Sequence, residues 1–171
     1  MKEMQKKSKM LNRAILCAAI ADGWALLLAV ASFFKEVPAF IPSILVGIVY
    51  YGYVVIAQKK RLHLLQVLSF AGIALSVVAA VMFAFFESKA WIMILFTAYG
   101  LVGFFSGIAL LQLSKEFKTL VIVLSFLLML TNGLYALIFL NPALSMLGFY
   151  ISMPTTIIEV LFLINVAKKI K

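Results

Sequence analysis

The sequence predicts an all-α fold, a polytopic membrane bundle of six transmembrane helices with both termini in the cytoplasm. Composition, the length of the apolar runs and the sidedness of the basic residues predict it. Of the 171 residues, 65% are hydrophobic and 12% are charged, whereas a soluble domain is about half apolar and roughly a quarter charged. A chain of this length has room for a single domain, residues 1–171, and for no separate soluble domain.

Six apolar runs each have the roughly 20 residues that an α-helix needs to cross the hydrocarbon core of a bilayer. The expected spans are residues 14–34, 38–57, 64–86, 90–113, 119–140 and 146–166. Only short segments separate them, so consecutive helices should run antiparallel as neighbours.

Small and polar residues, spaced three or four apart, predict which face of each span packs inward, because membrane helices meet where small residues allow close approach. In chain order, these residues are Ala18, Asp22, Ala25, Ala29 and Ser32; Ser43, Gly47 and Tyr50 or Tyr51; Ser69, Gly72, Ser76 and Ala79; Gly100, Gly103 and Gly107; and Gly148, Ser152, Thr155 and Glu159. Gly100, Gly103 and Gly107 form the clearest helix-packing stripe.

The basic residues orient the bundle, since Lys and Arg in short loops favour the cytoplasmic side. With the N-terminus inside, all 15 Lys and Arg except Lys35 and Lys89 fall on that side. The inner residues are Lys2, Lys6, Lys7, Lys9, Arg13, Lys59, Lys60, Arg61, Lys115, Lys118, Lys168, Lys169 and Lys171. We expect a multi-pass protein of the cell (inner) membrane. This topology accounts for the net charge of +9 better than nucleic-acid binding, which needs a basic, water-facing surface.

The N-terminal segment also fits a secretory signal, with Lys-rich residues 1–13, an apolar run and a small-x-small pattern at Ala29-Val30-Ala31. The run is longer than the usual ~7–15 residues of a signal peptide, and it contains Asp22. We therefore expect it to stay as the first transmembrane helix.

Asp22 and Glu159 are the acidic residues well inside predicted spans, and no Lys, Arg or His lies within any span. Each is nine residues from a cytoplasmic anchor, Arg13 or Lys168, which is about 13 Å along a helix. Helices one and six could therefore bring the carboxyl groups together, where at least one should keep its proton. Such a pair could share a proton, bind a cation or accept a cationic ligand.

Other polar residues could complete this candidate ligand- or proton-binding site. Asn132 and Tyr135 lie in the fifth span, and Thr155 and Thr156 follow Pro154 in the sixth. The proline removes a backbone hydrogen bond and frees a carbonyl near Tyr150, as in the broken helices that line transporter sites. In a simpler interpretation, Glu159 is protonated and bonded to a carbonyl or to Asn132, and Asp22 bridges helices through water.

Catalytic and metal-binding patterns are missing from the sequence. The single histidine, His63, belongs to a basic loop, and the single cysteine, Cys17, lies in an apolar run where it is expected to pack. We therefore predict no enzyme, no cofactor and no metal site.

Two functions remain open. The first is a solute-binding or proton-linked transport protein that uses the intramembrane carboxylates to bind a small molecule or a cation. The alternative is an accessory, regulatory or immunity-type protein that contacts a membrane partner or a second copy through its helices. With either function, we expect the lipid bilayer to surround the protein, and we expect no nucleic-acid partner.

Six helices, both ends inside, and the spacing Ala14-x-x-x-Ala18 in the first span resemble the substrate-binding subunits of energy-coupling-factor vitamin importers. The resemblance covers length, topology and this spacing. It implies a vitamin ligand and an ATPase partner module. It does not extend to the structured outer loops that close over the vitamin in that family, because here the outer loops are a few residues long.

Overall fold

The computed structural model describes residues 2–86 and 88–169, and the side chains of residues 9–86, 88 and 90–169. Every regular element in these residues is helical. The elements are α1 (Lys2–Ala31), α2 (Phe40–Lys60), α3 (His63–Phe85), α4 (Lys89–Leu110), the 3-10 turn η1 (Leu111–Leu113), α5 (Ser114–Ala136) and α6 (Ala143–Lys169). The predicted all-α class is confirmed, with element bounds within a few residues of expectation except that α1 begins well before residue 14.

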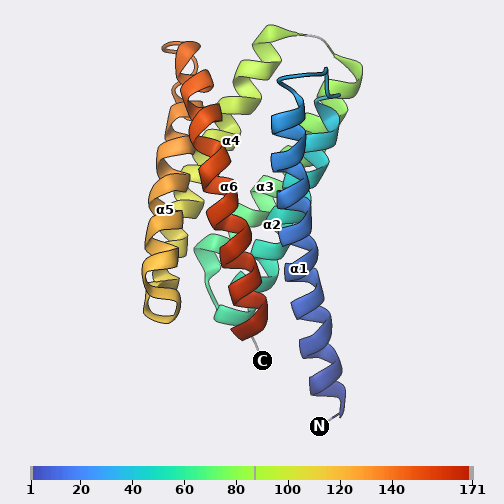
Figure 1. The fold of residues 1–171 in the computed structure, drawn as a ribbon, viewed down its shortest axis with the longest axis vertical. Helices are drawn as coiled ribbons and strands as arrows, with labels where there is room; N and C mark the ends of the chain where they lie inside the picture. Colours follow the sequence, from blue (N-terminus) through green and yellow to red (C-terminus); the bar gives the residue numbers. More distant parts are fainter. Residues whose placement is uncertain (1, 87, 170–171) are drawn as a thin grey trace.

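Five stretches of the described chain are long and apolar enough to cross a membrane, not the six separate runs expected. They are Lys9–Ala31, Phe40–Lys60, His63–Phe85, Ala90–Ala136 and Ala143–Lys169. The difference arises because the expected fourth and fifth spans merge into one stretch of 47 residues. The turn between them, η1 and the start of α5, is itself mostly helical and partly apolar. Within this stretch, α4 and α5 pack side by side (Figure 1).

The helices form a closed ring. Each helix contacts the next along the chain, and α6 returns to contact α1. The chain begins at the same end of the bundle at which α6 finishes (Figure 1). At the opposite end, the ring of Phe33 packs against Phe149 and Tyr150 of α6, with centroids 5.6 and 6.4 Å apart.

One end of the bundle is strongly basic. The described basic side chains at this end, which we call the basic rim, are Lys9, Arg13, Lys59, Lys60, Arg61, Lys115, Lys118, Lys168 and Lys169, with His63 at the start of α3. Glu116 forms an ion pair with Lys60 and so ties the start of α5 to the end of α2. The side chains of Lys2, Lys6, Lys7, Lys89 and Lys171, which also entered the charge prediction, lie outside the described residues.

Lys118 adopts a strained backbone conformation at the reversal between α4 and α5, with φ 44° and ψ −128°. A β-carbon makes this region costly for L-residues, by about 1–3 kcal/mol, whereas glycine adopts it freely. We expect Lys118→Gly to raise the free energy of unfolding by about 1 kcal/mol, because the greater chain entropy of glycine offsets about 0.4–1 kcal/mol of the relief.

Lys115→Gly is the matched control, since it removes the same charge from a neighbouring position that is helical. There, glycine should destabilise by about 0.5–1 kcal/mol. Thermal unfolding in detergent compares the two variants. Equal shifts of the same sign would show that Lys118 carries no strain.

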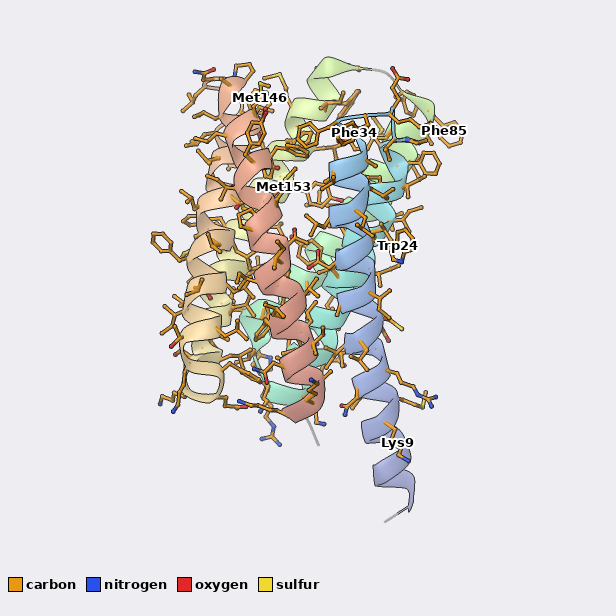
Figure 2. The ribbon with its side chains drawn as sticks, in the orientation of Figure 1. Lys9, Trp24, Phe34, Phe85, Met146 and Met153 are labelled. Atoms are coloured by element: carbon orange, nitrogen blue, oxygen red, sulfur yellow. The ribbon has the colours of Figure 1, made fainter. Side chains whose placement is uncertain are left out.

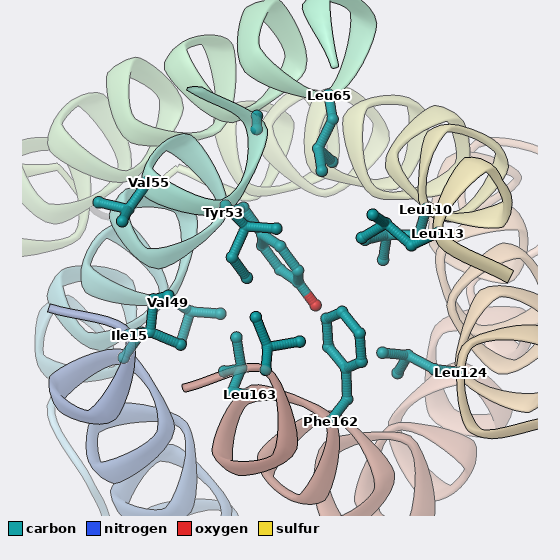
Figure 3. Packing of buried hydrophobic residues seen from close by; sticks show 14 of the residues in the cluster. Ile15, Val49, Tyr53, Val55, Leu65, Leu110, Leu113, Leu124, Phe162 and Leu163 are labelled. Carbon is teal, nitrogen blue, oxygen red and sulfur yellow. The ribbon is translucent and has the colours of Figure 1, made fainter. Parts of the chain in front are cut away.

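The most tightly buried apolar side chains gather in the half of the bundle nearest the basic rim, and Figure 3 shows several of them packed together. We call these residues the apolar plug; they are Ile15, Ile56, Leu65, Leu110, Leu124, Phe162, Leu163 and Val166, and all have 0% exposure. The ring of Phe117 meets that of Phe162 edge to face, 5.5 Å between centroids. Large apolar side chains such as Trp24 (Figure 2) and Phe126 are instead exposed on the outside of the bundle, where lipid tails would cover them.

Candidate functional site

The two intramembrane acids both face the interior of the ring. Asp22 on α1 is 6% exposed and Glu159 on α6 is 8% exposed. The two side chains are near enough to interact electrostatically. Both acids therefore lie on the interior faces of adjacent helices and within electrostatic range of each other, at the matching depths that the sequence indicated.

Tyr53 joins α2 to this pair. Its hydroxyl donates a hydrogen bond to Glu159 Oε1 across the interior, and Figure 3 shows the side chain reaching from its helix toward the centre of the ring. Tyr53 is 3% exposed and also lies within electrostatic range of Asp22. Three helices, α1, α2 and α6, thus converge on one polar point.

Asp22 is the incompletely satisfied member of the group. Its Oδ2 atom is buried, and among the described residues it has no hydrogen-bond partner. The nearest basic residues in the sequence, Arg13 and Lys168, are each nine positions from one of the acids. An uncompensated carboxylate in such surroundings is unfavourable. A proton or a cationic group between Asp22 and Glu159 would relieve both the missing bond and the mutual repulsion.

A second polar layer lies beside the acids, on α2, α3 and α4. The rings of Tyr50 and Tyr53 have centroids 6.5 Å apart, and Tyr50 is within electrostatic range of Glu159. Gly72 makes room for Tyr50, since a β-carbon there would lie 2.5 Å from the Cγ atom of Tyr50. Tyr99 donates to Ser76 Oγ at 3.0 Å, and Ser76 donates to the Gly72 carbonyl at 2.8 Å.

Tyr53 was not among the residues predicted from the sequence. It lies three positions after Tyr50, on the face already marked by Gly47 and Tyr50, so the periodicity of small and polar residues could have included it. Tyrosine is common in membrane helices for reasons of packing and interfacial anchoring. Its role at this site depends on Glu159, which lies 106 positions away.

Asn132 lies at the contact between α4 and α5. Its Nδ2 donates to the Leu128 carbonyl at 2.9 Å, and its side chain occupies the space above Gly103, where a β-carbon would lie 2.3 Å from Oδ1. A β-carbon on Gly100 would lie 2.4 Å from the backbone nitrogen of Ala136. The predicted glycine stripe therefore packs α4 against α5 within this chain.

The predicted residues of α6 divide between two environments. Thr155, one turn before Glu159 on the same face, is 2% exposed and donates to the Ile151 carbonyl at 2.7 Å. The Thr155 hydroxyl has a single proton, which this bond uses. The hydroxyl of Thr131 on α5 therefore donates the 3.0 Å hydrogen bond between the two threonines. Thr156 is half-buried.

Tyr135, on α5, packs against Gly148 of α6. A β-carbon added at Gly148 would lie 3.2 Å from the tyrosine ring.

Helix α1 uses its small residues within the chain. Ala18 has 0% exposure, and a β-carbon on Gly52 of α2 would lie 2.4 Å from that of Ala18. Ala18 of the Ala14-x-x-x-Ala18 pattern therefore packs against α2 of the same chain. Cys17, expected to pack, is exposed on the outer face of the helix.

The described residues contain no group of three or more His, Cys, Asp or Glu side chains that could hold a metal ion. Comparison of the chain with models of known protein families, with curated proteins and with solved structures found no match.

Proposed function

We propose that this protein is a small transport protein of the cell membrane that binds a proton or a small solute at the Asp22–Glu159 pair. One observation carries the proposal: a buried carboxyl oxygen of Asp22 without a described partner lies within electrostatic range of a second buried acid. Ionisable groups inside a membrane are costly and usually mark proton or solute pathways. A purely structural acid would be expected to have its oxygens satisfied, as buried polar groups generally are.

The proposal includes six crossings with both termini in the cytoplasm. Ala90–Ala136 has 47 residues, about twice the length that one crossing requires, and α4 and α5 pack against each other within it. The basic rim lies at the end where the chain starts and α6 finishes, and basic residues favour the cytoplasmic side.

Movement of α6 relative to α1 is the proposed link between binding and transport. These two helices close the ring and carry the two acids. Pro154 lies five residues before Glu159 inside α6 and cannot donate the backbone hydrogen bond that would stiffen the helix there. Bending at this point would change the separation of the carboxyl groups, and so their affinity for a shared proton or cation.

The decisive variants are Asp22→Asn and Glu159→Gln, which keep the shape of each side chain and remove its charge. Purified protein is placed in vesicles that contain a pH-sensitive dye, and a membrane potential is imposed in the presence of panels of small solutes. We expect wild type to move protons or a solute, and both variants to fall to the background of protein-free vesicles while their thermal unfolding stays cooperative.

Glu116→Gln is the control, because this acid lies in the exposed turn at the basic rim and should leave transport intact. Infrared spectra test separately whether a carboxyl group of the site holds a proton. A carbonyl band of a protonated carboxylic acid should be present in wild type and in Glu116→Gln, and should weaken in Asp22→Asn and Glu159→Gln. Transport and spectra unchanged in the two amide variants would remove the proposal.

The alternative function, helix contact with a membrane partner, would need a surface other than the glycine stripe. Gly100, Gly103 and Gly107 already pack on α5, so the surface that the sequence offered for a partner is occupied by the chain itself.

A further inference from the structure

We propose that the Asp22–Glu159 site takes a protonated organic amine, and that the amine reaches it from the end of the bundle opposite the basic rim. This inference rests on the proposed function and adds the chemical class of the ligand and its route.

The hydrogen-bonding groups of the site define the charge of the ligand. Carboxylate oxygens accept hydrogen bonds, and one oxygen of Glu159 is already taken by Tyr53. What Asp22 Oδ2 needs is a donor. A primary ammonium offers three donors and a full positive charge, so one group could bond both Asp22 and Glu159 and cancel their repulsion.

The surroundings of the acids favour an organic cation over a bare metal ion. Tyr50 and Tyr53 present rings next to the acids, both buried and 6.5 Å apart. Aromatic faces attract ammonium groups, by about 2 kcal/mol or more where water is excluded. A hard divalent ion such as calcium takes about 6–8 oxygen ligands, whereas the described residues bring together only two acids and tyrosine hydroxyls.

Burial along one face of α6 indicates the route. On the side of the basic rim, Phe162, Leu163 and Val166 have 0% exposure and belong to the apolar plug. On the other side, Ser152 lies two turns from Glu159 on the same face and is half-buried. Tyr99 of α4 and Tyr135 of α5, also toward that end, are half-buried as well. On this face of α6, burial therefore continues from Glu159 to Val166 on the basic side, whereas on the opposite side Thr155 is 2% exposed and Ser152, about one turn further, is half-buried.

Charge at the two ends favours the same route. The described acid at the basic rim, Glu116, is paired with Lys60, so the rim repels cations. At the opposite end, the described charges Lys35 and Glu36 balance, and the rings of Phe33, Phe149 and Tyr150 lie together there. An amine would be repelled at one end and attracted to aromatic faces at the other.

The ligand class is tested with benzylamine and with benzyl alcohol, which has nearly the same shape and no charge. Binding to detergent-purified wild type is followed by calorimetry and by the shift in unfolding temperature. We expect benzylamine to bind and stabilise wild type and Glu116→Gln, benzyl alcohol to do neither, and Asp22→Asn and Glu159→Gln to lose the response to the amine. Equal responses to both compounds, or to the amine in all variants, would overturn the inference.

Failure of this inference can be told apart from failure of the proposed function. An acid carbonyl band or proton flux that depends on Asp22 and Glu159, without any response to benzylamine, would leave the function standing and exclude the amine. Loss of both signals would remove both.

The route is tested with two cysteine variants on one face of α6 in a Cys17→Ser background. Ser152→Cys and Val166→Cys, both nearly isosteric, lie on either side of Glu159. Intact cells are treated with a membrane-impermeant, positively charged thiosulfonate reagent. Asn141→Cys and Lys115→Cys, in turns at opposite ends, report which end faces the medium.

We expect Ser152→Cys and Asn141→Cys to be labelled in intact cells, and benzylamine to slow labelling of Ser152→Cys but not of Asn141→Cys. Lys115→Cys should react only after the cells are permeabilised, and Val166→Cys should remain unreactive. Labelling of Val166→Cys as fast as that of Ser152→Cys, or no labelling of Ser152→Cys from the side of Asn141, would overturn the route.

Discussion

Gly100→Ala is expected to destabilise the protein by about 3 kcal/mol, at the upper end of the usual range for overpacking. The added β-carbon would lie 2.4 Å from the backbone nitrogen of Ala136, 2.6 Å from the Asn132 carbonyl oxygen and 2.8 Å from the Cα atom of Ala136. A flexible side chain could rotate away, but these are backbone atoms of α5, so the helices themselves must separate. Unfolding of purified protein by a denaturing detergent measures the loss.

Gly23→Ala provides the control, because a β-carbon there meets no atom within 4 Å. Alanine is the better helix former by about 0.8–1 kcal/mol, so this variant should unfold no more easily than wild type. Similar losses in the two variants would mean that the close contact between α4 and α5 does not hold the bundle together.

Phe162→Ala is expected to cost about 3–5 kcal/mol, the range found when a buried aromatic side chain is truncated. Phe162 is fully buried in the apolar plug and packs edge to face on Phe117. In a membrane, the loss arises mainly from missing packing contacts, because lipid tails solvate apolar groups as well as the protein interior does. Thermal unfolding in detergent gives the size of the effect.

Phe126→Ala removes the same group from a side chain that is 65% exposed on the outer face, and it should change stability little. The plug also predicts a second consequence for Phe162→Ala. Combined with Val166→Cys, it should make the cysteine reactive toward small thiol reagents, because the cavity gives a small apolar reagent room to reach the thiol. An unreactive cysteine in a destabilised protein would show that other residues maintain the seal.

The positions of the helices could be predicted because hydropathy and length are local properties of a sequence. The position of the reversal between α4 and α5 could not be predicted as clearly. Leu111–Leu113 continue as a 3-10 turn and Ser114 restarts the helix, so local structure hardly marks the point at which the chain changes direction. The reversal depends on the backbone of Lys118, a residue whose type gives no indication of a positive φ.

The candidate site was partly predictable for a similar reason. A carboxyl group inside an apolar run is conspicuous wherever it packs, so Asp22 and Glu159 could be identified from the sequence alone. The placement of Asn132 against Gly103, and of Tyr53 against Glu159, depends on the rotation of each helix about its axis. Those rotations are set by contacts between distant segments, which one sequence does not reveal.

Closure of the ring by α6 has a consequence for biosynthesis. Asp22 is inserted with the first helix, whereas Glu159 arrives with the last. Until α6 is in place, the side of the ring between α1 and α5 is open, and a carboxyl group at the middle of a bilayer costs about 2.5–3.5 kcal/mol on insertion scales. An unfinished or truncated chain thus displays a polar group that the completed protein conceals, which gives membrane chaperones and proteases a means of telling the two apart.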